Sequence, residues 1–140
     1  MKTAIAVNPE STWKKSALLV LLIGLLDSAF LLYHHVAVNG GYQSGPSICS
    51  FSDTFDCDKV AQSPYAEILG IPAASLGLFF YLLVLVWIVS EGRKSEAGYR
   101  GGFLILAAAG LACSLWFAYV SLFLLNYVCL FCSLLYLVNL

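Results

Sequence analysis

Long apolar runs constrain the fold of this chain more than any other feature. They cover residues 17–38, 71–90, 103–127 and 128–140. The first three runs are each long enough to cross about 30 Å of hydrocarbon at a helical rise of about 1.5 Å per residue. With 61% hydrophobic and only 11% charged residues, the chain also lacks the polar coat of a water-soluble globule. We therefore expect a membrane protein.

The runs are expected to be helices. None of them shows the strict alternation of apolar and polar residues that a lipid-facing barrel strand requires. The sequence thus predicts an all-α membrane protein, a four-transmembrane-helix bundle in a single domain over residues 1–140, with an outer loop at 39–70. The fourth run reaches only about 20 Å as a helix. We expect this last helix to be truncated at Leu140.

A short helix is expected within the outer loop. Ser63 followed by Pro64 is typical of a helix start, and Gly70 is typical of a helix stop. Such a helix would place Tyr65 and Leu69 where they can lie on the membrane surface. It could act as a lid on the bundle, or it could be an ordinary loop helix without a gating role.

The basic residues predict the orientation. Cytoplasmic ends of membrane helices are enriched in lysine and arginine. Lys59 falls in the outer loop, and the other basic residues lie on the opposite side: Lys2, Lys14, Lys15, Arg93, Lys94 and Arg100. We expect an inner (cytoplasmic) membrane protein with a cytoplasmic amino terminus and a periplasmic or extracellular outer loop.

Four cysteines lie on this outer side, where disulfides persist. Cys49 and Cys57 belong to the outer loop, and Cys129 and Cys132 form a C-x-x-C motif where the fourth run begins. Free amide groups at a helix start favour a thiolate, and a spacing of three puts both sulfurs on nearly the same face. Cys132 lies about 4.5 Å deeper. The pattern indicates a relay in which Cys129 meets protein thiols and Cys132 meets a lipid-soluble acceptor.

Other interpretations of the cysteines remain open. The Cys49 and Cys57 pair could be a permanent loop disulfide, and all four outer thiols could hold a structural zinc ion. The fifth cysteine, Cys113, lies in the third run and is expected to be a buried, unreactive thiol. The shortage of polar residues in the runs argues against a hydrophilic pore.

Ionisable residues inside the first run suggest a second feature. Asp27 lies in the middle of this run, and His34 follows it on almost the same helical face, with His35 next to it. These residues could form a proton path. Alternatively, Asp27 could join helices through hydrogen bonds while the histidines lie at the wet interface.

Several motifs follow one another in a defined order along most of the chain: Cys49, Cys57-Asp58-Lys59-Val60, Ser63-Pro64-Tyr65, Gly70-Ile71-Pro72, and Cys129-Leu130-Phe131-Cys132 with Tyr136 after it. In this order they resemble the vitamin K epoxide reductase family in its prokaryotic form. The combination is far more specific than either cysteine pair alone.

The resemblance implies a four-helix bundle around a quinone, either ubiquinone or menaquinone. Electrons would come from a periplasmic thioredoxin-like or DsbA-like protein, in which a disulfide bond is made. The resemblance assigns Cys49 to the exchange with this partner, Cys57 to the exchange with Cys129, and Cys132 to reduction of the quinone.

The resemblance also implies a quinone pocket. Ser63 and Tyr136 match family positions near this pocket and could donate hydrogen bonds to a quinone oxygen. Vertebrate members carry an asparagine at the start of the second helix, where this chain has Ala73 and Ala74. We therefore expect quinone reduction rather than epoxide reduction. The alternatives are a quinone epoxide reductase and a non-enzymatic protein with a zinc site or structural disulfides.

Overall fold

The computed structural model describes residues 9–90 and 96–139, and within them the chain is mostly helical, as the sequence predicts. The elements in chain order are α1 (Pro9–Asn39), α2 (Cys57–Ala61), β1 (Glu67–Ile68), β2 (Ile71–Pro72), α3 (Ala73–Val89), α4 (Glu96–Tyr119), the π-helical segment η2 (Val120–Leu125) and α5 (Leu130–Val138).

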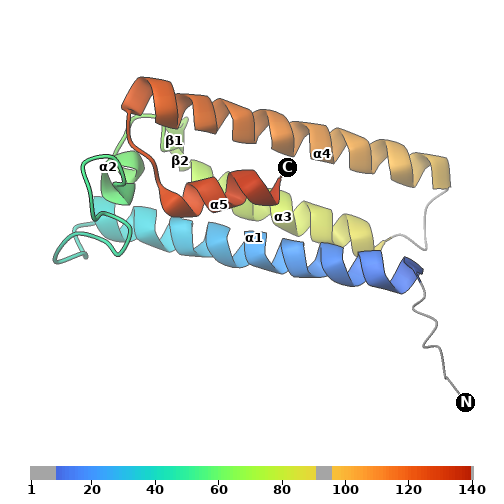
Figure 1. Cartoon of the computed structure of the whole chain (residues 1–140). Coiled ribbons are helices and arrows are strands. Elements are labelled where there is room, and N and C mark those ends of the chain that lie inside the picture. The colour runs from blue at the N-terminus through green and yellow to red at the C-terminus, as the bar shows by residue number, and fades with distance from the viewer. Residues whose placement is uncertain (1–8, 91–95, 140) are drawn as a thin grey trace, which may run out of the picture.

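The helices α1, α3, α4 and α5 lie alongside one another (Figure 1). α1 packs along α3 and α5, and α4 contacts both α3 and α5. α5 runs antiparallel to α1. The ring of Phe131, near the start of α5, lies 4.5 Å from that of Phe30, whereas Leu135 packs against the core cluster that contains Leu21 and Tyr81.

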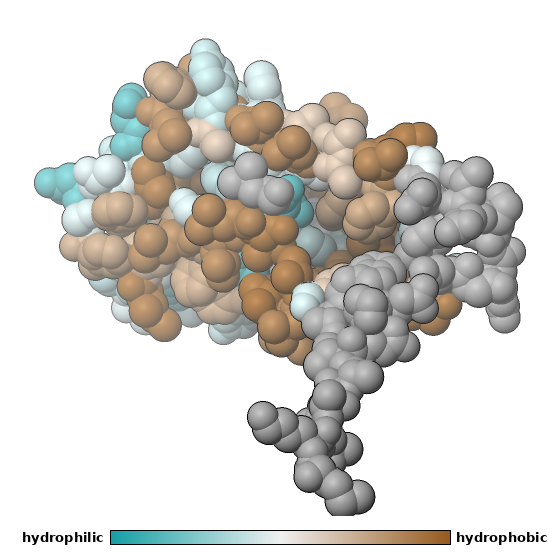
Figure 2. All heavy atoms as spheres, turned by 45° about the vertical axis from the view of Figure 1, so that its right-hand side comes forward, coloured by the Kyte–Doolittle hydropathy of each residue, from teal (hydrophilic) through white to brown (hydrophobic). Residues whose placement is uncertain are grey.

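Two helical segments are long and apolar enough to cross a membrane, judged by length and composition: Lys15–Asn39 and Gly101–Leu125. α3 is also apolar but shorter, at 17 residues. Large apolar side chains point outward from both long segments, since Leu26 is 63% exposed and Leu104 is 67% exposed. Figure 2 shows such side chains over much of the visible face. A large exposed apolar surface of this kind fits contact with lipid.

The helix bounds differ from the predicted ones mainly at their starts. α1 begins at Pro9, well before residue 17, because proline is favourable at the first helical position. α3 begins at Ala73 rather than at residue 71, because Ile71 and Pro72 belong to β2. α4 begins at Glu96, before residue 103, and α5 begins at Leu130 with Cys129 as its N-cap.

The prediction of a loop helix between Ser63 and Gly70 is wrong. The segment instead forms a two-stranded antiparallel hairpin that pairs Glu67 with Pro72. Leu69 and Gly70 have φ angles of 55° and 78°, so the backbone makes a tight left-handed turn there. Glycine adopts this conformation at little cost, and its turn signal therefore marks a hairpin and not a helix end.

The outer loop does contain a helix, but at an earlier position. α2 begins at Cys57, and the carboxylate of Asp56 accepts a hydrogen bond of 3.1 Å from the backbone N–H of Lys59. This is the usual N-cap geometry for aspartate. The cap gives Cys57 a fixed position at the first residue of the helix.

The helix ends separate several basic residues from the cysteine-containing loop. The start of α1, the end of α3 and the start of α4 lie at one end of the molecule, and α2 lies at the other (Figure 1). Lys14, Lys15 and Arg100 therefore belong to the end opposite the cysteine-containing loop. Lys2, Arg93 and Lys94 lie outside the described residues.

Candidate redox site

Three cysteine sulfurs meet at the loop end of the molecule. Cys49 and Cys57 are joined by a disulfide with a Cα–Cα distance of 5.7 Å. The sulfurs of Cys49, Cys57 and Cys129 all lie within 4.8 Å of one another, and all three side chains are buried. A thiol next to a disulfide is arranged for thiol–disulfide exchange. The two cysteine pairs therefore meet, although Cys57 and Cys129 are 72 positions apart in the sequence.

Backbone pairing explains why the two pairs meet. Phe55 and Val128 form an isolated parallel β-bridge, and the backbone N–H of Val128 donates a 2.8 Å hydrogen bond to the carbonyl of Thr54. Cys57 follows one partner of this bridge, and Cys129 follows the other. The bridge thus fixes the outer loop beside the entrance to α5.

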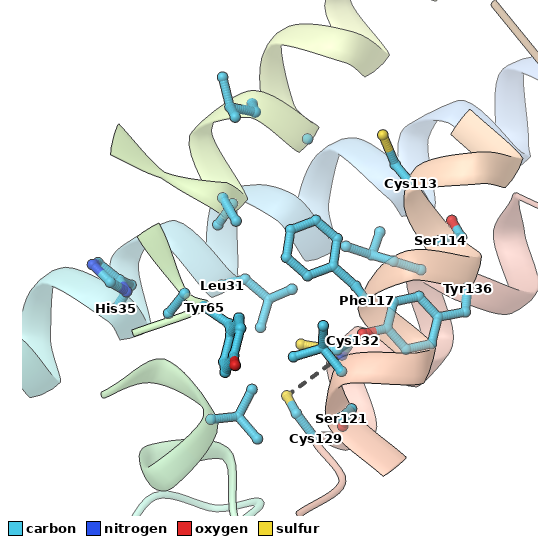
Figure 3. Close-up of a pocket in the computed structure, with 18 of the residues that line it drawn as sticks. Leu31, His35, Tyr65, Cys113, Ser114, Phe117, Ser121, Cys129, Cys132 and Tyr136 are labelled. Carbon is cyan, nitrogen blue, oxygen red and sulfur yellow. Dashed lines mark hydrogen bonds between the residues drawn. The ribbon is translucent and has the colours of Figure 1, made fainter. Parts of the chain in front are cut away.

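Cys129 occupies the N-cap of α5. Its sulfur accepts a hydrogen bond of 3.4 Å from the backbone N–H of Cys132 (Figure 3). Backbone N–H groups at a helix start stabilise a thiolate, as the sequence predicts for this position. Cys129 and Cys132 are both free thiols. The inner pair is therefore a dithiol while the outer pair is a disulfide.

A largely apolar cavity of about 260 Å³ adjoins these sulfurs. Its lining includes Cys57, Cys129 and Cys132 from the two pairs, together with Ser63 and Tyr136. Figure 3 shows Tyr136 and Cys132 near one another on the α5 side of this cavity. Small-molecule sites typically combine apolar walls with a few polar groups, at volumes of about 300–1,000 Å³. The volume of this cavity lies just below this range.

The polar groups of the lining suit a flat ring that carries acceptor oxygens. The hydroxyl of Ser63 donates to the carbonyl of Val60 at 2.8 Å, so its hydrogen is already engaged. The Tyr136 hydroxyl forms no hydrogen bond within the described part of the chain, and it can donate to a ligand. Ala73 and Ala74 also line the cavity and leave its wall apolar at their positions. These residues fit a quinone.

Two buried histidines bind the outer loop to α1. His34 donates from Nε2 to Oδ1 of Asp58 at 2.9 Å, and His35 donates from Nε2 to Oε1 of Glu67 at 3.1 Å. Both histidines are buried. The outer loop therefore shields both imidazole rings from water. Sequence spacing does not predict the His34–Asp58 or the His35–Glu67 hydrogen bond. The one local signal is that Asp58 directly follows Cys57.

The carboxylate of Asp58 accepts hydrogen bonds from several segments of the chain. Its carboxylate also accepts from the backbone N–H of Ser47 at 2.9 Å and from the side chain of Gln43 at 3.3 Å. Burial raises the pKa of Asp58, but hydrogen bonds from Ser47, His34 and Ser50 outweigh burial, so the pKa lies below its ordinary 3.8. Asp58 is therefore ionised at neutral pH and holds the loop through charge-assisted hydrogen bonds.

Two further residues behave differently from their predicted roles. The side chain of Asp27 is buried, yet neither carboxylate oxygen has a hydrogen-bond partner within the described residues. The interpretation that Asp27 joins helices through hydrogen bonds is therefore wrong. Cys113 is exposed and lines the cavity. The expectation of a buried Cys113 is also wrong, because this side chain opens into the cavity.

The zinc interpretation is at odds with the arrangement of the sulfurs. Among the described residues, the group close enough to share a metal contains Cys49, Cys57 and Cys129. Cys132 is not part of it. Zinc binds cysteine as the thiolate, and the disulfide removes that form from Cys49 and Cys57.

These features define a class: a helical membrane protein with a disulfide and a dithiol in contact beside an apolar cavity, that is, a membrane oxidoreductase. The chain belongs to the vitamin K epoxide reductase family, whose sequence profile matches residues 16–140. The resemblance identified from the motifs is thereby confirmed. No curated protein matched the chain.

Proposed function

We propose that the protein is a thiol–disulfide oxidoreductase that transfers electrons from a thioredoxin-like or DsbA-like protein to a quinone in the membrane. The observation that carries this proposal is the position of the Cys129 sulfur. It lies within 4.8 Å of both sulfurs of the outer disulfide, and it adjoins a cavity that Cys132 also lines. Electrons can therefore pass from loop to cavity through two adjacent cysteine pairs. The result would be a disulfide bond in the partner protein.

Transfer begins at the outer pair. A thiolate of the reduced partner attacks Cys49, the partner–Cys49 bond forms, and Cys57 is released as a thiolate. Cys57 then attacks Cys129 of an inner disulfide, and Cys132 retains the electron pair of the broken bond. The second partner thiol releases Cys49 as the partner disulfide forms. Cys49 finally attacks Cys57 and frees Cys129.

This sequence would leave the outer pair as a disulfide and the inner pair as a dithiol, and the pairing of these cysteines in the fold supports it. In the last step Cys129 and Cys132 give up two electrons and form a disulfide, and the quinone takes up the electrons. The hydroxyl of Tyr136 would donate a hydrogen bond to a quinone oxygen, and Ser63 lines the same cavity.

Apolar residues next to Cys49 suggest how the partner binds. Cys49 is itself buried, whereas Ile48 is 89% exposed and Phe51 is 63% exposed. Exposed apolar side chains on a loop are typical of protein-binding sites. We infer that a partner covers Ile48 and Phe51 and that the loop opens to present Cys49.

The proposed location is the inner (cytoplasmic) membrane, crossed by α1, α3 and α4, with the shorter α5 packed against α1 and α4. The basic residues at the start of α1 and of α4 support a cytoplasmic location for that end. The cysteine-containing loop then faces the periplasm or the cell exterior, where a disulfide persists.

Replacement of Cys132 tests the proposal. The experiment mixes a reduced partner, a quinone and the purified protein, and it follows quinone absorbance. Cys132→Ser should reduce turnover at least 100-fold, because the inner disulfide cannot form. Cys113→Ser is a matched control, since Cys113 lines the same cavity but has no role in the transfer. Unchanged quinone consumption by Cys132→Ser would overturn the proposal.

A further inference from the structure

A buried acid without a partner lies within α1. Asp27 is 6% exposed, and neither of its carboxylate oxygens has a hydrogen-bond partner among the described residues. The neighbouring Ser28 is fully buried and its hydroxyl is likewise unpaired in this part of the chain. Burial of a carboxyl group without hydrogen bonds is energetically costly, and more so when the group is charged. An acid kept at such a cost inside a membrane helix is typically functional.

Its neighbours place Asp27 on the side of α1 that faces the inner cysteine pair. Before Asp27 in α1, Gly24 lies against the ring of Tyr81. A Cβ atom at residue 24 would lie 2.5 Å from this ring. After Asp27, the ring of Phe30 packs against that of Phe131 at 4.5 Å. Asp27 lies between these two levels. Because α5 runs antiparallel to α1, the turn of α5 that follows Phe131 is the one opposite Asp27.

Three titratable groups face Asp27 from the elements packed against α1. They are Tyr81 on α3, whose ring lies against Gly24 about one turn before Asp27, and Cys129 and Cys132, which lie within two residues of Phe131 at the start of α5. Tyr81 already donates a hydrogen bond to Asn139 at 3.0 Å. Of the two thiols, Cys132 is the one released into apolar surroundings during the proposed exchange.

Release of Cys132 creates a charge that the site must neutralise. When Cys57 attacks Cys129, the Cys57–Cys129 bond forms and the Cys129–Cys132 bond breaks. The electron pair stays on the sulfur of Cys132, which becomes a thiolate away from water. A buried thiolate is a poor leaving group unless a nearby acid protonates it.

We propose that Asp27 is the acid–base partner of Cys132, an inference that rests on the exchange proposed above. The carboxylic acid of Asp27 gives its proton to the departing sulfur, which leaves a Cys132 thiol and an Asp27 carboxylate. When Cys132 later passes on its electrons, its proton returns to Asp27. The two protons of the quinol come from the Cys129 thiol and from water.

The exchange step can be measured without a quinone. The full-length protein is prepared with both pairs oxidised and mixed with dithiothreitol, and acid-quenched samples are alkylated and mapped by mass spectrometry. The readout is the rate at which Cys132 becomes free between pH 5.5 and pH 8.5. Asp27→Asn should slow this step at least tenfold at the acid end, since general acids typically contribute about 10²- to 10⁴-fold. The ratio of the wild-type rate to the Asp27→Asn rate should fall toward one at the alkaline end, where Asp27 has lost its proton.

Two variants serve as controls. Asp27→Glu keeps the acid and should restore most of the rate, whereas Ser28→Ala removes the adjacent buried hydroxyl and should leave the rate unchanged. If the Asp27→Asn substitution slows Cys132 release by the same ratio over the whole pH range, the role of Asp27 is merely structural and the inference is overturned. An unchanged rate of Cys132 release in Asp27→Asn would also overturn it. Normal release of Cys132 combined with a failure to reduce quinone would overturn the proposed function instead.

Discussion

The imidazole of His34 donates a 2.9 Å hydrogen bond to the carboxylate of Asp58, and Asp58 directly follows Cys57 in α2. The pair links the loop that carries the outer disulfide to the helix that forms one wall of the bundle. Since both side chains are largely shielded from water, this hydrogen bond is worth more than a surface ion pair. It positions Cys57 beside Cys129.

Loss of this hydrogen bond should loosen the loop. A hydrogen bond to a charged group contributes about 1.5–3 kcal/mol, so His34→Ala should raise amide hydrogen exchange in α2 by about 10- to 150-fold. Mass spectrometry of peptides that cover Cys57–Ala61 measures this rate. His35→Ala is the matched control and should have a smaller effect, because its partner Glu67 is 48% exposed. Equal exchange in wild type and His34→Ala would contradict the assigned role.

Acid should loosen the same loop. The pKa of Asp58 is lowered in the folded protein, so its stabilising effect is present above the unfolded value of about 3.9 and is lost as the pH falls through the folded value. Hydrogen exchange in α2, corrected for intrinsic rates, should stay constant from pH 7 to about pH 4 and rise below it. Asp58→Asn should exchange faster at neutral pH and lack most of the acid response. If Asp58→Asn keeps the full rise in hydrogen exchange at low pH, other carboxylates cause that rise.

Tyr136→Phe tests the quinone site. Removal of the hydroxyl deletes one hydrogen bond worth about 0.5–1.5 kcal/mol, so the KM for quinone should rise by about 2- to 12-fold. Tyr33→Phe is a suitable control, because Tyr33 is 72% exposed. A titration of quinone at saturating partner concentration separates KM from kcat. An unchanged KM would remove Tyr136 from the quinone site.

Ile48→Asp tests the partner surface. Burial of an isoleucine side chain contributes about 1.5–3 kcal/mol, so kcat/KM for a thioredoxin-like or DsbA-like protein should fall by at least tenfold. Turnover with dithiothreitol, which needs no protein surface, should remain within twofold of wild type. Parallel losses with both reductants would instead indicate damage to the disulfide itself.

Much of the fold was predictable because the membrane imposes strong constraints. The apolar runs predict helices in the correct regions, and the C-x-x-C motif falls at the start of α5 as expected. Helix starts were less predictable, because Pro9 and Glu96 lie in polar stretches where the apolar pattern gives no signal. The hairpin at Glu67–Pro72 was missed because Gly70 serves helix ends and tight turns alike.

The candidate site depends more on tertiary contacts. The cysteine pairs are visible in the sequence, but the Phe55–Val128 bridge that brings them together joins distant segments with no shared motif. The partner of His34 likewise lies 24 residues away. Sequence patterns report local periodicity, and they carry no direct information on which loop residue meets a given helix position.

The central claim is direct exchange between Cys57 and Cys129, and a trapping experiment tests it most directly. In the double variant Cys49→Ser, Cys132→Ser, Cys57 and Cys129 have each lost the cysteine with which they form a pair. Under mild oxidation they should form a Cys57–Cys129 disulfide in most molecules, detected as a cross-linked peptide by mass spectrometry, because their sulfurs lie within 4.8 Å. Persistence of both thiols in free form, or cross-links to Cys113 in their place, would contradict the relay.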